Sequence, residues 1–244
     1  DIHLVQLDFR PLNIPDEDAE PPLTMSYIDA SALLSARMAA HQAAMVAGTV
    51  TVLPSDASQT AFVTDAWYTT ADFFPMFRVP MQYGRAWGAA EDISHARLVV
   101  ISASLNNRLF GGADSVGNIL NLKGSQYRIV GVMSEWRPTP KFYNVSTSRR
   151  FARPEDVFIP LETALDDHLA LNGGFNCYGA PPDLTRLKTS DCGWLTLWVG
   201  FDAPAQKIAY SKYLRSYASN LHDTGVYARP PNGRLRDIVE LMTY

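Results

Sequence analysis

The chain has 244 residues, of which 47% are hydrophobic, and a formal net charge of −4. This length can bury a sizeable core, in one large domain or two small ones. A protein that binds nucleic acid non-specifically needs clustered Lys and Arg, and the one cluster here is the short run of Arg149, Arg150 and Arg153. We therefore expect no nucleic-acid partner. No stretch approaches the roughly 20 apolar residues that cross a bilayer, so no membrane-spanning segment is expected within the chain.

The first 67 residues have the pattern of a strand, a helix and a hairpin. Residues 3–9 alternate apolar and polar side chains, which indicates a strand. Ser26 is a predicted N-cap, because apolar residues at helical spacing follow it as far as Met38. Residues 45–53 and 59–67 are predicted to form a hairpin around an intervening turn.

The stretch from residue 68 has shorter elements separated by turns. A turn is expected at Gly84-Arg85, and Ser102 and Gly111 are the predicted cap and end of a helix. The expected elements are helices at 70–77 and 103–110, and strands at 98–101, 119–122, 127–133 and 156–160. Residues 136–153 and 166–191 lack periodicity and are predicted to be long loops.

From Gly193 the pattern returns to strand, helix and strand. The expected elements are a strand at 195–201, a helix that Asp202 caps, a short strand at 225–228 and an amphipathic segment at 235–244. The helix carries one apolar stripe, which consists of Tyr210, Tyr213, Leu214, Tyr217 and Leu221. Because the first and last blocks share this pattern, we predict a discontinuous α+β domain of residues 1–67 and 193–244. A β-rich domain of residues 68–192 is inserted into it.

The chain has two cysteines, Cys177 and Cys192, on either side of a segment rich in Gly, Pro and Asp. A disulfide between them would close a short loop and would indicate an oxidising compartment. The alternative is two unrelated free thiols. No Cys or His pair has the spacing of a structural zinc site.

No combination of side chains indicates catalysis or a cofactor. The five histidines are scattered, at His3, His41, His95, His168 and His222. Glu91-Asp92 and Asp166-Asp167 are adjacent pairs, and we expect them to be solvated acidic turns because neighbours do not face one another on a regular element. Ser102 lacks the Gly-x-Ser-x-Gly pattern of a nucleophile elbow. A set of aromatic residues is expected in the core rather than at a ligand site: Phe73, Phe74, Phe77, Tyr83 and Trp87. We therefore predict no catalytic, cofactor-binding or metal-binding residue, and no enzyme.

Five ordered motifs in the middle block resemble a known family. Their residues include Phe73, Phe74, Pro80, Gly84, Arg85, Arg108, Leu109, Phe110, Gly117, Gly131, Val132 and Pro160. Together they resemble the periplasmic core domain of MacB/FtsX-type ABC transporter permeases, the MacB-like periplasmic domain. Residues 23–27 also resemble the entry into the first periplasmic helix of that family.

The resemblance implies a fold and a place in a larger protein. It implies an α+β fold with a discontinuous strand-helix-strand, membrane-proximal subdomain (Porter-like) and an inserted, mainly β subdomain (Sabre-like). It also implies that Asp1 follows one transmembrane helix and that Tyr244 precedes another, on the periplasmic face of a bacterial inner membrane. The two long loops, 136–153 and 166–191, exceed what the family pattern leads us to expect.

The implied function is mechanical coupling of cytoplasmic ATP hydrolysis to efflux of a substrate or to action on a periplasmic partner. The implied partners are the transmembrane helices of the same permease, a second permease copy, a cytoplasmic ATPase domain or subunit, and a periplasmic adaptor or exported peptide or drug. Two alternatives remain open. One is a free periplasmic solute- or peptide-binding protein, and the other is a hydrolase that depends on His95 or His168.

Overall fold

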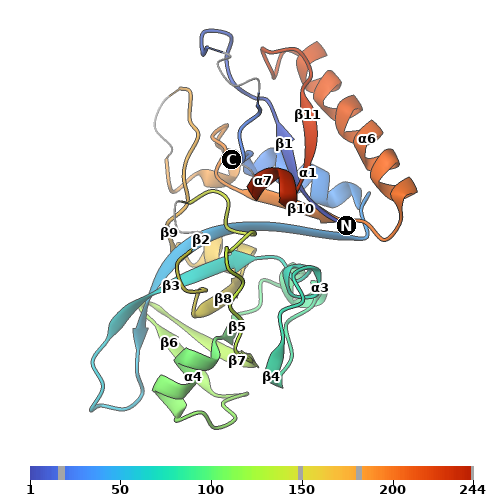
Figure 1. The fold of residues 1–244 in the computed structure, drawn as a ribbon. Helices are drawn as coiled ribbons and strands as arrows, with labels where there is room; N and C mark the ends of the chain where they lie inside the picture. Colours follow the sequence, from blue (N-terminus) through green and yellow to red (C-terminus); the bar gives the residue numbers. More distant parts are fainter. Residues whose placement is uncertain (16–19, 148–150, 180–182, 243–244) are drawn as a thin grey trace. The chain divides into compact units, whose positions relative to one another are not determined.

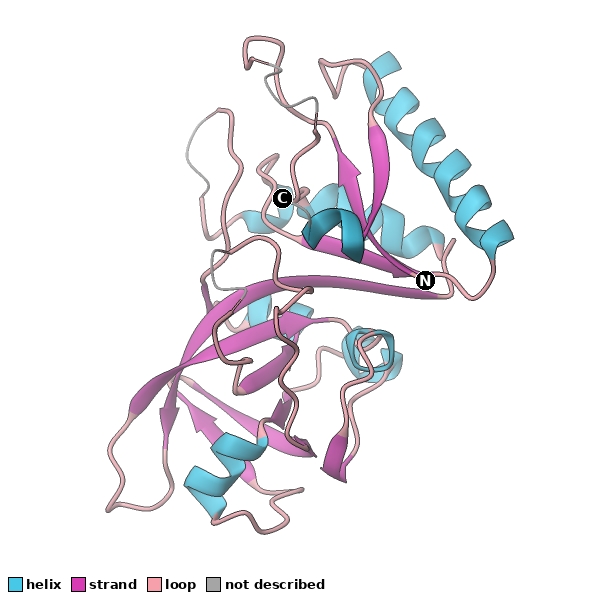
Figure 2. Cartoon of the chain, in the orientation of Figure 1, coloured by secondary structure: helices cyan, strands magenta, loops and turns pink. Residues whose placement is uncertain are grey.

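The structure is a computed structural model that describes residues 1–15, 20–147, 151–179 and 183–242. Arg149 and Arg150 of the basic run therefore lie outside the described residues, as do parts of both long loops. The chain separates into two compact units, residues 1–44 with 174–244 and residues 45–173. Both contain strands and helices (Figure 2), and the predicted α+β class is confirmed.

The first unit is built on three antiparallel strands, with β1 in the centre (Figure 1). They are β1 (Ile2–Leu7), β10 (Thr196–Gly200) and β11 (Gly233–Asp237). In the register, Leu4 lies opposite Trp198 on one side and Arg236 on the other. The other elements are α1 (Tyr27–Ala36), the 3-10 helix η1 (Leu187–Thr189), α6 (Pro204–Asp223) and α7 (Ile238–Met242). Since β1 has a partner on each side, its backbone hydrogen bonds are satisfied within this unit.

Helix α6 packs its apolar stripe on this sheet, as its periodicity predicts. Tyr210 and Leu214 are buried, and Tyr210 packs edge-on against Phe201 at 5.5 Å between ring centroids. A Cβ atom placed on Gly233 of β11 would meet Leu214 Cγ at 3.0 Å. The absence of a side chain at Gly233 therefore lets α6 lie close to the strand.

Three predictions for the end of the first unit are wrong in detail. Residues 225–228 form no strand, and the third strand is β11, which extends into the first part of the segment predicted as amphipathic. Residues 235–237 pair with β1, so the helix begins only at Ile238. Helix α6 has Ala203 rather than Asp202 at its N-cap, with Pro204 in the first turn.

The second unit contains a mixed sheet in the order β2-β3-β8-β5-β7-β4, with β6 paired to β2 and β7, and β9 to β2. The strands are β2 (His41–Leu53), β3 (Phe62–Thr69), β4 (Met81–Gly84), β5 (Leu98–Ile101), β6 (Ile119–Leu122), β7 (Ser125–Met133), β8 (Val157–Pro160) and β9 (Ala170–Leu171). Strands β3 and β8 are parallel, as are β5 and β7. Strand β2 carries the chain from the first unit into the second.

The β2–β3 hairpin has the predicted antiparallel pairing, from Met45 opposite Thr69 to Val52 opposite Phe62. The predicted domain division assigns this hairpin to the first domain. In the structure, residues 45–69 belong to the second unit, because β3 continues into the sheet through its parallel pairing with β8. The boundaries at 67/68 and 192/193 stay a prediction about folding domains.

The helices of the second unit are short. They are α2 (Phe73–Met76), α3 (Ala89–Ile93), α4 (Ala103–Phe110) and α5 (Leu161–Asp166). Helix α4 is confirmed together with its caps: Ser102 Oγ accepts from the Leu105 amide at 3.0 Å, and Gly111 is left-handed with φ 63°. Helices α3 and α5 and strand β4 were not predicted, because elements of four to six residues carry too little periodicity to stand out.

Candidate functional site

The motif residues all lie in the second unit, where they hold the fold together. Phe73 and Phe74 of α2 are buried and pack edge-on against each other at 5.6 Å between centroids. Phe74 packs on Trp87 at 4.6 Å and Phe73 on Tyr143 at 5.4 Å. These aromatic residues therefore belong to the core, as expected, and not to an open ligand site.

Two motif glycines allow strands β4 and β7 to approach closely. Gly84 pairs with Gly131, and Gly84 has φ 63°. A Cβ atom on Gly131 would meet the carbonyl oxygen of Arg85 at 2.6 Å, and one on Gly84 would overlap the carbonyl oxygen of Val130. Both positions therefore require glycine for steric reasons.

The motif arginines have structural partners rather than a ligand. Arg85 forms an ion pair with Glu91 at 3.2 Å, and the other oxygen of Glu91 accepts from the Gly88 amide. The Arg108 guanidinium lies 3.3 Å from the centroid of the Phe62 ring, which is a cation–π contact.

The remaining motif residues shape the backbone or the edge of the sheet. The Pro80 carbonyl accepts from the Ser134 amide at 3.0 Å, and the Gly117 amide, at φ 90°, donates to the Ile129 carbonyl at 2.8 Å. Pro160 and Val132 are buried, whereas Leu109 and Phe110 are half-buried on α4. None of these residues presents a reactive group.

The prediction of solvated acidic turns is wrong for Asp92 and Asp167. Asp92 accepts hydrogen bonds from the Ala71 amide at 2.7 Å and from Trp87 Nε1 at 2.8 Å, while burial raises its pKa to about 6. Asp167 accepts hydrogen bonds from Arg97 and Tyr127. Burial by itself would raise the pKa of Asp167, but these hydrogen bonds outweigh it and hold the pKa below the usual range. Both carboxylates are acceptors that join segments distant in the sequence.

One cluster of the described residues brings potential metal ligands together. The ligand atoms of His95, Glu162 and Asp166 all lie within 4.8 Å of one another. His95 and Asp166 are exposed, and His95 Nδ1 lies 2.5 Å from Asp166 Oδ2. No metal site was expected from the sequence. A surface hydrogen bond between His95 and Asp166 explains why these two side chains lie so close together.

The loop at residues 136–153 is anchored by a buried ion pair that no sequence pattern indicates. Lys141 Nζ lies 2.6 Å from Glu155 Oε1, and the two side chains are 2% and 3% exposed. Glu155 Oε2 accepts from the Tyr143 hydroxyl at 2.7 Å, and Lys141 Nζ also donates to the Arg153 carbonyl at 3.1 Å. Burial and the Glu155 charge raise the pKa of Tyr143, so its hydroxyl stays a donor. Spacing alone gives no sign of such a network.

A pocket of about 290 Å³ opens beside this loop, within the second unit. Its lining comes from the start of α4, the end of β7 and the two ends of the loop. The lining residues are Ser102, Ala103, Ser104, Asn107, Met133, Ser134, Glu135, Trp136, Arg137, Arg153, Pro154 and Asp156. The pocket combines an indole ring and other apolar groups with two guanidinium groups.

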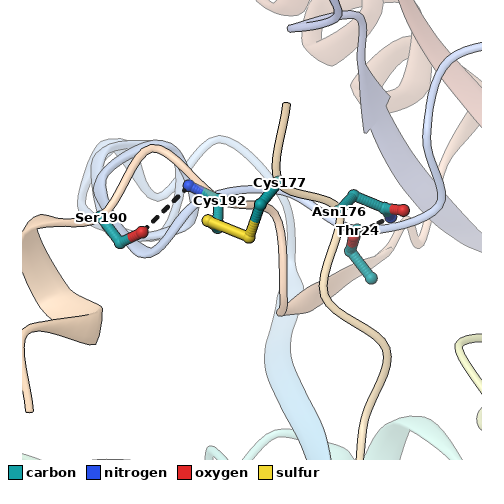
Figure 3. The surroundings of a disulfide bond; sticks show 5 residues. All are labelled: Thr24, Asn176, Cys177, Ser190 and Cys192. Atoms are coloured by element: carbon teal, nitrogen blue, oxygen red, sulfur yellow. Dashed lines mark hydrogen bonds between the residues drawn. A yellow bond between two sulfur atoms is a disulfide. The ribbon is translucent and has the colours of Figure 1, made fainter. Parts of the chain in front are cut away.

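In the first unit, Cys177 and Cys192 form a disulfide, with their Cα atoms 4.5 Å apart (Figure 3). Ser190 Oγ accepts from the Cys192 amide at 3.1 Å, and Asn176 Nδ2 donates to Thr24 Oγ1 at 2.7 Å. The backbones of Asn176 and Gly193 also pair. The second long loop is therefore fastened at the point where it returns to β10.

A second buried acceptor ties the helices of the first unit together. Asp29 of α1 is 5% exposed and accepts from the hydroxyls of Tyr217 at 2.8 Å and Tyr227 at 2.6 Å. Burial, followed by the Asp29 charge, raises the pKa of both tyrosines. The Tyr227 contact places residues 225–228 against α1 rather than in the sheet.

Among the described residues, no helix combines the length and apolar character needed to cross a membrane. The pattern of the MacB-like periplasmic core domain family matches residues 4–190. No curated protein matches the chain.

Three solved structures share the fold. The periplasmic region of MacB from Actinobacillus actinomycetemcomitans has a TM-score of 0.59 at 11% identity, over 99% of this chain and 91% of that one. The extracellular domain of the noncanonic ABC-type transporter YknZ from Gram-positive bacteria has a TM-score of 0.58 at 12% identity, over 97% and 100%. A domain of a permease protein from Porphyromonas gingivalis has a TM-score of 0.58 at 15% identity, over 96% and 88%. The chain belongs to the MacB-like periplasmic core domain family, whose members are extracytoplasmic domains of ABC-type transporter permeases.

Proposed function

We propose that this domain transmits motion mechanically from the membrane part of an ABC transporter permease to its extracytoplasmic side. ATP hydrolysis by a cytoplasmic ATPase domain or subunit would supply the energy. The outcome would be export of a substrate, such as a peptide or drug, or action on a periplasmic partner or adaptor. A second permease copy would complete the assembly.

The observation that carries the proposal is the pairing of the first and last strands. His3 of β1 lies opposite Asp237 of β11, and both strands belong to the first unit. A displacement applied to the transmembrane segments proposed before Asp1 and after Tyr244 would therefore enter through one unit. The chain passes between the two units at 44/45 and again at 173/174.

A transmitting element must also resist deformation. The first unit has a three-stranded sheet, the disulfide and the Asp29 acceptor, which together connect its sheet, helices and loop. The second unit has the buried Lys141–Glu155 pair in its longest described loop. Such cross-links favour movement of whole units over local bending, which is what a nucleotide-dependent two-state device requires.

The test uses the full-length permease with its ATPase, reconstituted in lipid. Spin labels would be attached to genetically encoded ketone-bearing residues at Ile208 on α6 and Val63 on β3, which are 70% and 68% exposed. This chemistry leaves the disulfide intact. We expect the Ile208–Val63 distance, or the distance between the two copies of Ile208, to change between the nucleotide-free and ATP-bound states.

A pair within the first unit, Ile208 and Val239, provides the control, and its distance should stay constant. If neither the distance between units nor the distance between copies responds to ATP, the domain does not transmit motion. A free solute-binding protein would instead show a change on ligand addition without any ATPase.

A further inference from the structure

We propose that the pocket beside the 136–153 loop binds a carboxylate group that neighbours an apolar side chain, as found in a peptide. Three features of the pocket favour such a ligand: its size, the way its walls are held and the charge that its lining leaves available. At about 290 Å³ the pocket suits a single residue or short segment rather than a large ligand.

The two walls of the pocket are tied to one buried network. On one side, Trp136 stacks on Tyr143 at 5.3 Å between centroids with an interplanar angle of 14°, and the Tyr143 hydroxyl donates to Glu155. On the other side, Lys141 holds the Arg153 carbonyl, and Glu155 stands between the lining residues Pro154 and Asp156. The Lys141–Glu155 pair thus fixes both walls, which reduces the entropy lost when a ligand binds.

The lining contains two carboxylates as well as two guanidinium groups, so its formal charges balance. Asp156 is already engaged, because its two oxygens accept from Ser102 Oγ at 2.5 Å and Thr64 Oγ1 at 2.7 Å. Glu135 pairs with Arg137 through Nε at 2.9 Å, and both side chains are 72% exposed. The remaining guanidinium, that of Arg153, has no carboxylate partner among the residues that the structure places.

A planar guanidinium that is free on the rim of a pocket matches a carboxylate through paired hydrogen bonds. The indole of Trp136, together with Met133 and Pro154, offers apolar surface beside it. An apolar side chain next to a carboxylate satisfies both features. A C-terminal residue has this chemistry, and so does an acidic residue next to an aromatic one.

The test is a titration of the isotope-labelled 244-residue chain followed by amide NMR shifts. The probes are N-acetylphenylalanine, its amide, and N-acetylaspartylphenylalaninamide. For a ligand of this size we expect a dissociation constant on the order of 1 mM, with shifts at Ser104, Trp136 and Arg153. The neutral amide should bind at least about fivefold more weakly than the acid.

The aspartyl probe separates the two sources of the carboxylate. Binding as tight as that of N-acetylphenylalanine would assign the pocket to internal acidic residues, and weaker binding to a peptide C-terminus. Arg153→Gln should remove the preference for the acid over the amide. Arg128→Gln is the matched control, since Arg128 is an exposed arginine five residues before Met133 on β7.

The proposal is overturned if no saturable shift occurs in the pocket up to about 10 mM probe. Equal affinity for the acid and the amide, or equal loss in the Arg128→Gln control, would overturn it as well. Unchanged circular dichroism and melting temperature would show that each variant is folded. A negative result would leave the proposed transmission of motion untouched, because this titration involves no ATPase.

Discussion

Lys141 and Glu155 form an ion pair that is almost completely removed from solvent, with 2.6 Å between Nζ and Oε1. Taking two charges out of water is costly, and the pair offsets this cost only while both partners are present. Its further hydrogen bonds join the Tyr143 side chain and the Arg153 carbonyl, so the pair ties together the described parts of this loop, which contain no helix or strand.

Removing one partner should therefore cost much more than removing both charges. We expect Lys141→Met to lower the free energy of unfolding by about 3–5 kcal/mol, because the Glu155 charge is left buried and uncompensated. The double variant Lys141→Met, Glu155→Gln should be more stable than Lys141→Met alone, since Gln keeps an acceptor for Tyr143. Urea unfolding at pH 7 measures both values. Arg137→Ala, at a 72% exposed side chain, should change stability by less than about 0.5 kcal/mol. Equal losses in the single and double variants would argue against a buried pair.

The disulfide should stabilise the first unit by restricting the unfolded chain. Cys177 and Cys192 are 15 residues apart, and closing a loop of that length contributes about 3 kcal/mol. The Cys177→Ser, Cys192→Ser double variant should lose about that much stability in urea, and reductant should then have no further effect. Mass spectrometry after alkylation without reduction should find no labelled cysteine in the parent protein. Two labelled cysteines would refute the bond.

Much of the fold follows from local sequence signals. Ser102 and Gly111 mark both ends of α4 because caps act within one turn, and Tyr210 with Leu214 marks the buried face of α6 because helical periodicity persists over 20 residues. Strand β11 was missed because its partner, β1, lies more than 200 residues away and no local signal reports that pairing.

The candidate site was less predictable than the fold. The sequence identified the motif residues, but not that Gly84 faces Gly131 across two strands. Charged residues in an aperiodic loop are ordinarily solvated, so Lys141 and Glu155 gave no sign that they meet in the interior. The pocket depends on that meeting, and therefore could not be inferred from spacing.

Gly48 of β2 should tolerate no side chain. A Cβ atom there would overlap the Tyr68 ring, which is fully buried and whose hydroxyl donates to the Ala170 carbonyl at 3.0 Å. Because the ring is held at both ends, Gly48→Ala should destabilise the protein by about 1–3 kcal/mol. Gly179→Ala is the control, since a Cβ atom at Gly179 meets no atom of the described residues within 4 Å. Thermal unfolding gives the melting temperatures of both variants, and that of Gly48→Ala should be the lower. Similar melting temperatures would show that Tyr68 can move aside.

Asp92 should make stability depend on pH in a direction opposite to that of most acidic groups. Burial raises its pKa from 3.8 to about 6. At pH values between these two, the folded protein keeps a proton on Asp92 that the unfolded chain has released. Stability from this group is therefore highest below about pH 4 and falls as the pH rises to about 6, by up to about 3 kcal/mol.

Asp8 and Asp167 act in the opposite sense, because their pKa values are lowered on folding and their contribution is lost as the pH falls. The Asp92 contribution must therefore be measured as the difference between the parent protein and Asp92→Asn. As the pH rises from 4 to 7, we expect the unfolding free energy of the parent to fall relative to that of the variant, because the variant has no carboxylate to ionise in the interior. A difference that stays constant over this range would mean that the hydrogen bonds from Ala71 and Trp87 compensate for the burial of the charge.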